Sequence, residues 1–268
     1  MSAFRLFPAL EEIFAHPSAS FKYVFLPLLT VDLSALGKGK GKAHFIEIMG
    51  EKEPDNTTLD DKMGYNFVRF KRAGDMYVFE GDLNYVDLDN FAHWYGEAEE
   101  EYRLNKKDYL TPKPSREAVE HSMWRKNRNA SENLELRNHH LKLSKEAKDK
   151  NTWMKNKNAA EYLESRHYYL EKILNYWITR DKFLETGKFI HGSYYTEWDY
   201  SSNEGEVYLD EDFYDDYWEN IEELVIGDLV KRMTCAGLIE GYSYVDHGAD
   251  EIWLFTDERE AVLYFNWT

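Results

Sequence analysis

Hydrophobic positions recur at two periods along the chain, and these divide it into strand-rich ends and a helical middle. Apolar–polar alternation and short runs of aromatic and β-branched residues predict strands at 21–33, 43–49, 65–70, 76–81, 239–246, 251–256 and 261–267. Apolar spacings of three and four predict helices at 4–14, 88–109 and 152–183. Short polar connections at 71–75, 247–250 and 257–260 have hairpin length, so the strands beside them are expected to pair antiparallel.

These elements predict an α+β fold with two antiparallel β patches. One patch lies in the N-terminal half and the other is a C-terminal meander, and both pack with helices around a long helical insertion. The corresponding parts are an N-terminal α+β portion at 1–110, a basic helical insertion at 111–188, and an acidic helix plus the meander at 189–268. They are expected to form one compact unit or two closely packed subdomains, since 268 residues can bury a sizeable core.

The two long predicted helices have recognisable faces. Asp87 or Asp89 is expected to cap the first. Its apolar face contains Phe91, Trp94, Tyr95, Ala98, Tyr102 and Tyr109. The stripe of the second contains Trp153, Ala160, Leu163, His167, Leu170, Leu174, Trp177 and Ile178. Residues 125–158 are poor in apolar side chains, which predicts an arm that projects or packs on one face only.

Charge is distributed unevenly along the chain, whose net charge is −17. Residues 1–102 hold 10 basic and 18 acidic residues, residues 103–188 hold 20 and 12, and residues 189–268 hold 3 and 20. The acidic balance argues against nucleic acid as the main ligand, although the basic segment around Arg125, Lys126 and Arg128 keeps that alternative open locally. The sequence also leaves open whether this basic segment docks on the acidic segment of a second copy.

The expected compartment is the cytoplasm. The single cysteine, Cys235, excludes an intrachain disulfide and fits a reducing environment, where it is expected to be a small buried apolar group. The N-terminal residues have no basic, apolar and small-residue arrangement typical of a secretory signal. The longest apolar run, Val24 to Val31, is far too short to span a membrane, so no membrane partner is expected.

The stretch from Tyr194 to Leu224 concentrates carboxylates and large aromatic rings. It contains twelve acids and no Lys or Arg: Glu197, Asp199, Glu204, Glu206, Asp210, Glu211, Asp212, Asp215, Asp216, Glu219, Glu222 and Glu223. Such a surface would attract a cationic partner, and the interleaved Tyr and Trp residues are the types that dominate interface hot spots. The residues expected to contact a partner are Trp198, Asp199, Asp210, Asp212, Tyr214, Asp215, Asp216, Trp218 and Glu219.

An ordinary surface helix is the alternative for this stretch. From Phe213 onward apolar residues recur at three and four, while the acids occupy the other side, as on a solvated helix. The spacing does not fit a calcium-binding EF-hand loop, because Ile221 occupies the position that requires a bidentate Glu when Asp210 is taken as the first.

Searches for catalytic, cofactor and metal motifs give little. The Gly-Lys run at 37–42 lacks the spacing of a phosphate-binding loop and is predicted to be a hairpin loop. Glu164 and His167 form one Glu-x-x-His step, but a di-iron bundle needs two, and the neighbouring His139 and His140 point to different helix faces. We therefore expect neither a metal nor a cofactor.

A carbohydrate-active enzyme is the alternative function, since such clefts combine aromatic platforms with paired carboxylates. The stretch could supply the parts from Trp198, Asp199, Glu204, Glu206 and Tyr208. In general character, however, the chain resembles immunity proteins that neutralise bacterial toxins, being acidic, aromatic-rich and without catalytic motifs. This resemblance implies a non-enzymatic module that masks the active cleft of a basic toxin.

Overall fold

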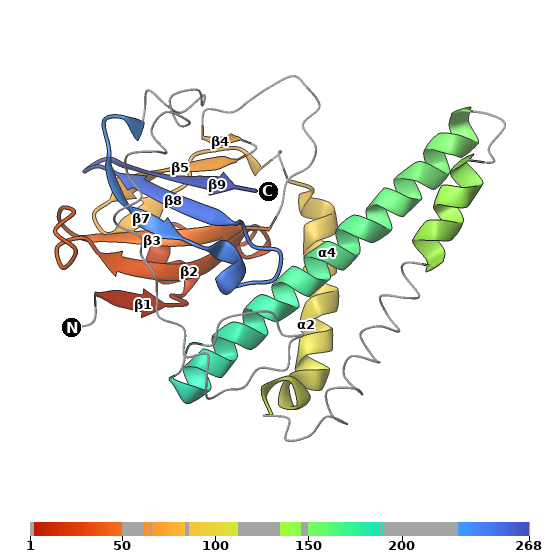
Figure 1. Ribbon diagram of the computed structural model, residues 1–268, viewed down its shortest axis with the longest axis horizontal. Coiled ribbons are helices and arrows are strands. Elements are labelled where there is room, and N and C mark those ends of the chain that lie inside the picture. The colour runs from red at the N-terminus through yellow and green to blue at the C-terminus, as the bar shows by residue number, and fades with distance from the viewer. Residues whose placement is uncertain are drawn as a thin grey trace.

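A computed structural model describes residues 3–49, 62–64, 66–83, 86–111, 135–145, 150–187, 189 and 230–267. It contains two antiparallel sheets with helices packed beside them, which confirms the predicted α+β class (Figure 1). The first sheet has the order β1-β2-β3, with β1 at Phe4–Leu6, β2 at Phe25–Asp32 and β3 at Lys42–Ile48. β2 and β3 are buried along almost their whole length, so apolar side chains occupy both of their faces.

The second sheet combines strands from both ends of the chain. Its order is β4 (Met63–Gly64), β5 (Phe67–Ala73), β9 (Glu260–Asn266), β8 (Glu251–Thr256) and β7 (Thr234–Ile239), and β6 (Met76–Val78) pairs with β5. The predicted hairpin formed by β5 and β6 is confirmed. β5 also pairs antiparallel with β9, so the N-terminal hairpin and the C-terminal strands form one continuous surface.

The helices lie mainly to one side of the sheets (Figure 1). They are α1 (Leu10–Ile13), α2 (Leu88–Leu110), a helix at 135–145 and α4 (Lys150–Thr186), with 3₁₀ turns η1 (Phe21–Tyr23) and η3 (Gly241–Ser243). Asp87 caps α2 by accepting a hydrogen bond from the backbone N–H of Asn90, as predicted. Among the residues described, no helix is both long enough and apolar enough to cross a lipid bilayer.

The helix predicted at 152–183 is present as α4, and part of its predicted stripe is buried. Ala160, Trp177 and Ile178 are buried, whereas Leu163, His167, Leu170 and Leu174 are only half-buried. The buried face also includes Tyr169, Lys172, Ile173 and Tyr176. Tyr169 and Tyr176 can be buried because their hydroxyl groups form hydrogen bonds. The Tyr176 hydroxyl donates to the Pro27 carbonyl at 2.8 Å, and the Tyr169 hydroxyl donates to the Tyr23 carbonyl at 3.3 Å.

Two further predictions about local structure were wrong. Residues 4–14 were expected to form one helix, but Phe4–Leu6 pairs with β2 and Phe7 has a φ of 48°, which interrupts a helix. Residues 239–246 were expected to form a strand, which instead ends at Ile239. Beyond it, Tyr242 N–H donates to the Ala249 carbonyl and Gly248 N–H to the Val245 carbonyl, so these groups bond within a local turn.

Apolar side chains form two clusters on opposite faces of the second sheet. Successive side chains of a strand point to opposite faces. Leu254 and Leu263 accordingly belong to the main core shared with the first sheet and the helices, while Trp253 and Val262 belong to a second cluster on the other face. The main core is rich in aromatic rings, as the composition indicated, and includes the stacked pair Phe70 and Tyr77.

The Gly-Lys run connects β2 to β3, which confirms the predicted hairpin loop. Gly37, Gly39 and Gly41 have φ values of 69°, 135° and 81°, a region that glycine adopts without steric cost. The loop is tied to the second sheet at its end, where the Asp75 carboxylate accepts from Lys42 N–H at 3.0 Å and Arg72 donates to the Lys42 carbonyl at 3.0 Å.

Candidate functional site

The partner-binding residues predicted from the sequence lie outside the described part of the chain. They are Trp198, Asp199, Asp210, Asp212, Tyr214, Asp215, Asp216, Trp218 and Glu219. Glu204, Glu206 and Tyr208, which the carbohydrate alternative uses, lie outside it as well. We call residues 190–229 the acidic segment. The structure describes the two residues that flank it, Phe189 and Val230.

Phe189 fixes the chain to the main core just before the acidic segment. Its ring is buried and lies 4.9 Å from the ring of Tyr244 and 6.0 Å from that of Phe7, measured between centroids. Aromatic contacts at these separations add to the free energy gained by burying the rings. The acidic segment therefore starts from a residue that is held firmly against the fold.

Val230 fixes the other end of the acidic segment, on the opposite face of the second sheet. It is fully buried in the second cluster, together with Met233 and the rings of Trp253 and Phe255. Cys235 belongs to the same cluster and is buried, which confirms the predicted packing role. Phe189 and Val230, which flank the segment, thus lie in clusters on opposite faces of the second sheet.

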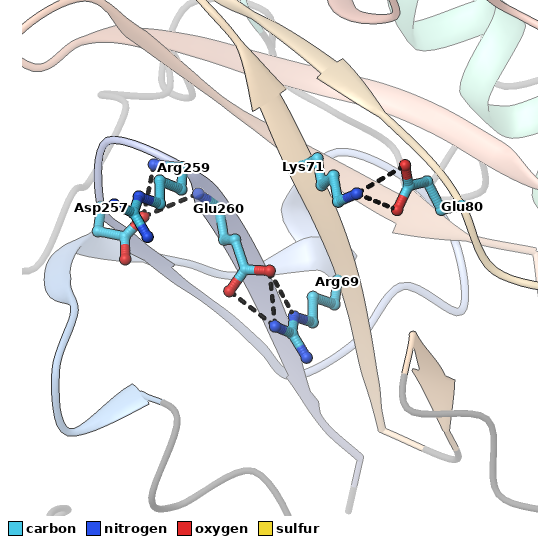
Figure 2. Close-up of polar contacts among 6 residues, drawn as sticks. All are labelled: Arg69, Lys71, Glu80, Asp257, Arg259 and Glu260. Atoms are coloured by element: carbon cyan, nitrogen blue, oxygen red, sulfur yellow. Dashed lines mark hydrogen bonds and ion pairs between the residues drawn. The ribbon is translucent and has the colours of Figure 1, made fainter.

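Charged side chains of β5, β9 and the nearby turns form polar contacts beside the second cluster (Figure 2). Arg69 on β5 donates to both carboxylate oxygens of Glu260 on β9, at 2.6 and 2.8 Å, and Lys71 pairs with Glu80 at 2.7 Å. Asp257 accepts from the N–H groups of Arg259 and Glu260 and so closes the β8–β9 turn. Of these contacts, the Arg69–Glu260 pair joins β5 to β9 and supports the pairing of the two strands.

The most deeply buried charged groups are Glu47 on β3 and Lys172 on α4. Both side chains have an exposed fraction of 0%. Lys172 Nζ donates to the Ile48 carbonyl at 2.8 Å and to Glu47 Oε1 at 3.3 Å, and it lies 5.1 Å from the centroid of the Trp267 ring. Because neither group is reached by solvent, no solute can reach the pair while the protein is folded.

Glu47 also binds the turn that follows β7. Its Oε2 accepts from the Ala249 N–H at 2.9 Å and its Oε1 accepts from the Ile48 N–H at 3.2 Å. Burial raises the pKa of Glu47, while the Lys172 ammonium and these N–H groups oppose the shift. The carboxylate therefore joins β3, α4 and the 241–249 turn, which is a structural role.

Histidines gather at the edge of the same region. His167 and His247 each place Nε2 near Glu171 Oε2, at 3.4 and 3.3 Å, and the His247 ring lies 4.7 Å from the Tyr168 ring. Glu164 instead pairs with Arg137, so the two members of the Glu-x-x-His step engage different partners. Within the described ranges, no group of three or more His, Cys, Asp or Glu side chains is arranged to hold a metal ion.

Another buried polar group is His44 on β3. Its Nε2–H donates to the Asp75 carbonyl at 2.7 Å, which leaves Nδ1 to accept from the Thr30 hydroxyl at 2.8 Å. Burial lowers the pKa of His44 to about 4, although the bond to Asp75 acts in the opposite direction. The ring is thus a neutral bridge between β2, β3 and the β5–β6 turn.

Comparison of the chain with protein-family models, with curated proteins and with solved structures found no match.

The pairing of Glu47 with Lys172 was not predicted from the sequence. Glu47 lies in an alternating strand where the pattern assigns it to the polar face, and Lys172 lies between Leu170 and Leu174 of the predicted stripe. One signal was available, because Lys172 is three residues after Tyr169 and four before Tyr176, which places it on the same helix face as these two aromatic residues. A pairing over this sequence distance has no local signature.

Proposed function

We propose that this protein is a non-enzymatic binding module that neutralises a basic protein partner, in the manner of an immunity protein that masks the active cleft of a toxin. The observation that carries the proposal is the acidic segment, with twelve carboxylates and no Lys or Arg between Tyr194 and Leu224. Its charge would speed the encounter with a cationic protein, and its Trp and Tyr rings would supply the lasting contacts.

The ends of the acidic segment support this proposal. Phe189 and Val230 are both buried, in clusters on opposite faces of the second sheet. A segment attached at both ends loses less conformational entropy on binding than a free tail of the same length. This attachment favours a binding surface that belongs to the fold over a loosely tethered acidic tail.

In the proposed mechanism, carboxylates pair with Lys and Arg side chains around the partner's cleft. Asp210, Asp212, Asp215, Asp216 and Glu219 would form these pairs. Trp198, Tyr214 and Trp218 would fill apolar pockets between them. If the partner cleaves nucleic acid, the carboxylates take the places of substrate phosphates, since both present anionic oxygens to the same basic side chains.

The product of the gene upstream of this one is the first partner to test. Association of the two purified proteins should be measured by surface plasmon resonance at low and at high ionic strength. Reversing Asp215, Asp216 and Glu219 to Lys should slow association by about tenfold or more at low ionic strength, with a smaller effect when salt screens the charges.

A matched control reverses three exposed acids elsewhere, Glu11, Glu99 and Glu258, to Lys, and so changes the net charge equally. If both triple variants slow association by the same factor, net charge alone is responsible and the proposed surface is wrong. Hydrolysis of chromogenic glycosides by the wild-type protein, lost when a single carboxylate of the acidic segment is neutralised, would support the enzyme instead.

A further inference from the structure

The helix at 135–145 and residues 150–164 of α4 extend away from both sheets (Figure 1). We call this pair of segments the helical arm. Arg137 Nε donates to Glu164 Oε2 at 3.0 Å and joins the two helices. At the base of the arm, Trp94 Nε1–H of α2 donates to the Tyr162 hydroxyl at 3.1 Å. The rest of α4 continues from there into the main core.

Large apolar side chains are exposed on the arm. Leu136 is 46% exposed, Leu143 37% and Met154 41%. Leu136 and Leu143 are two helical turns apart and therefore lie on one side of their helix. Apolar groups surrounded by charged ones are the arrangement found in protein interfaces, where an apolar centre has a polar rim.

The arm is basic, in a protein whose net charge is −17. Its two segments hold six basic residues, Arg137, Lys142, Lys145, Lys150, Lys155 and Lys157, and three acids, Glu135, Glu161 and Glu164. Glu164 pairs with Arg137, and Glu161 pairs with Lys157 at 3.2 Å.

Three other lysines of the arm face solvent. Lys142, Lys145 and Lys155 are exposed, and none of them forms a salt bridge within the part of the chain that the structure places. The arm therefore offers positive charge beside exposed Leu and Met side chains.

We propose that the helical arm binds the acidic part of a second copy of this chain. Residues 189–268 hold 20 acidic and 3 basic residues, so every copy carries a part of the chain whose net charge is opposite to that of the arm. An acidic protein surface can bury Leu136, Leu143 and Met154 while its carboxylates pair with the lysines around them. A nucleic acid matches the lysines but leaves these apolar groups without a contact, and the net charge of −17 repels it.

The contact joins two different surfaces, the arm of one copy and the acidic part of the other. A contact of this kind gives a closed dimer when the two arms exchange reciprocally and larger assemblies when they do not. The inference goes beyond the function proposed above, because it concerns self-association. It also implies that a basic partner and a second copy compete for the same acidic residues.

The test is sedimentation equilibrium of the purified full chain at low ionic strength, over a range of protein concentrations. The wild-type protein should self-associate, and added salt should dissociate the complex. Reversing Lys142, Lys145 and Lys155 to Glu should weaken the association by roughly a hundredfold, because each reversal replaces an attraction with a repulsion. The control reverses the exposed Lys40, Lys42 and Lys107 to Glu and should still associate.

A charge exchange separates this proposal from general effects of charge. Adding Asp215→Lys, Asp216→Lys and Glu219→Lys to the arm variant should restore part of the association, since three pairs of opposite charge can then form again with the signs exchanged. A wild-type chain that stays monomeric at low salt overturns the proposal, and so does an arm variant that associates as strongly as the control. Retention of the wild-type chain on a single-stranded oligonucleotide, lost in the arm variant and without self-association, would assign the arm to nucleic acid.

Discussion

The two halves of α4 differ in the burial of their polar side chains, although they belong to one continuous helix. In the C-terminal half, Lys172 has an exposed fraction of 0%, and Asp181 accepts from the Tyr102 hydroxyl at 2.9 Å and from Lys106 at 2.7 Å. In the arm, Lys155 is exposed. Polar groups in the buried half are bound to specific partners and serve the fold, whereas those in the arm remain accessible to another molecule.

The titration of Asp181 illustrates the buried half. Burial acts to raise the pKa of Asp181, but hydrogen bonds and charges from Lys106 and Arg180 more than offset it, so the pKa is lowered. A carboxylate with a lowered pKa contributes stability at neutral pH that is lost on acidification. The link that Asp181 makes between α4 and α2 is therefore strongest while its carboxylate is ionised.

The largest expected effect tests the buried half directly. Lys172→Met removes the ammonium and leaves the Glu47 carboxylate buried without its countercharge, which should lower the free energy of unfolding by about 3–5 kcal/mol. Urea denaturation, with the midpoint read at constant m-value, measures the change. The double variant Lys172→Met with Glu47→Gln should recover part of the loss, because no buried charge then remains.

If the single and double variants are equally destabilised, the loss comes from packing and not from the unpaired carboxylate. The comparison between the two halves of α4 would then need a different explanation.

The second expected effect is a dependence of stability on pH caused by His44. Its pKa is about 4 in the folded protein against 6.5 in the unfolded chain, so the unfolded state binds the additional proton between these values. Above pH 6.5 His44 is neutral in both states and does not change the free energy of unfolding. As the pH falls from 6.5 towards 4, protonation of the unfolded state lowers the free energy of unfolding by a total on the order of 3 kcal/mol. Urea unfolding measured at a series of pH values should show this slope.

His44→Asn should remove that part of the pH dependence, whatever it does to stability at neutral pH. An unchanged slope between wild type and variant would show that His44 is not the group responsible.

The smallest expected effect concerns the arm. Arg137→Ala breaks the ion pair between Arg137, whose side chain is 32% exposed, and Glu164, whose side chain is 60% exposed. Because solvent screens such a pair, the global free energy of unfolding should fall by less than about 1 kcal/mol. Amide hydrogen exchange should nevertheless become faster in the helix at 135–145, because the link to α4 is local. A loss as large as that of Lys172→Met would contradict the distinction between the two halves.

Much of the local structure follows from patterns in the sequence, because it depends on neighbouring residues. The Asp87 cap and the α2 face of Phe91, Trp94, Ala98 and Tyr102 follow from helical spacing, and β8 and β9 follow from composition and turn residues. The failures occur where distant contacts decide. Phe4–Leu6 becomes a strand because β2 is available to pair with it, which no pattern in the first fourteen residues indicates.

Long-range pairing and buried charge could not be predicted from the sequence. The register of Arg69 opposite Val262 and of Lys71 opposite Glu260 depends on two segments that are far apart in the sequence, since Arg69 and Glu260 are separated by 191 positions. Periodicity assigns Glu47 to the polar face of its strand, and only the assembled fold brings Glu47 and Lys172 together. The acidic segment could be recognised from composition, and its partner-contacting residues stay a prediction.

The position of β9 has a consequence for how the chain acquires its fold during synthesis. β9 lies between β5 and β8, so a strand made from residues 260–266 occupies the middle of the second sheet. Until those residues leave the ribosome, β5 has an open edge and the earlier half of the protein cannot complete its hydrophobic layer. Folding must therefore wait for late translation, and a nascent chain stalled before residue 260 is expected to recruit chaperones and to be sensitive to proteases.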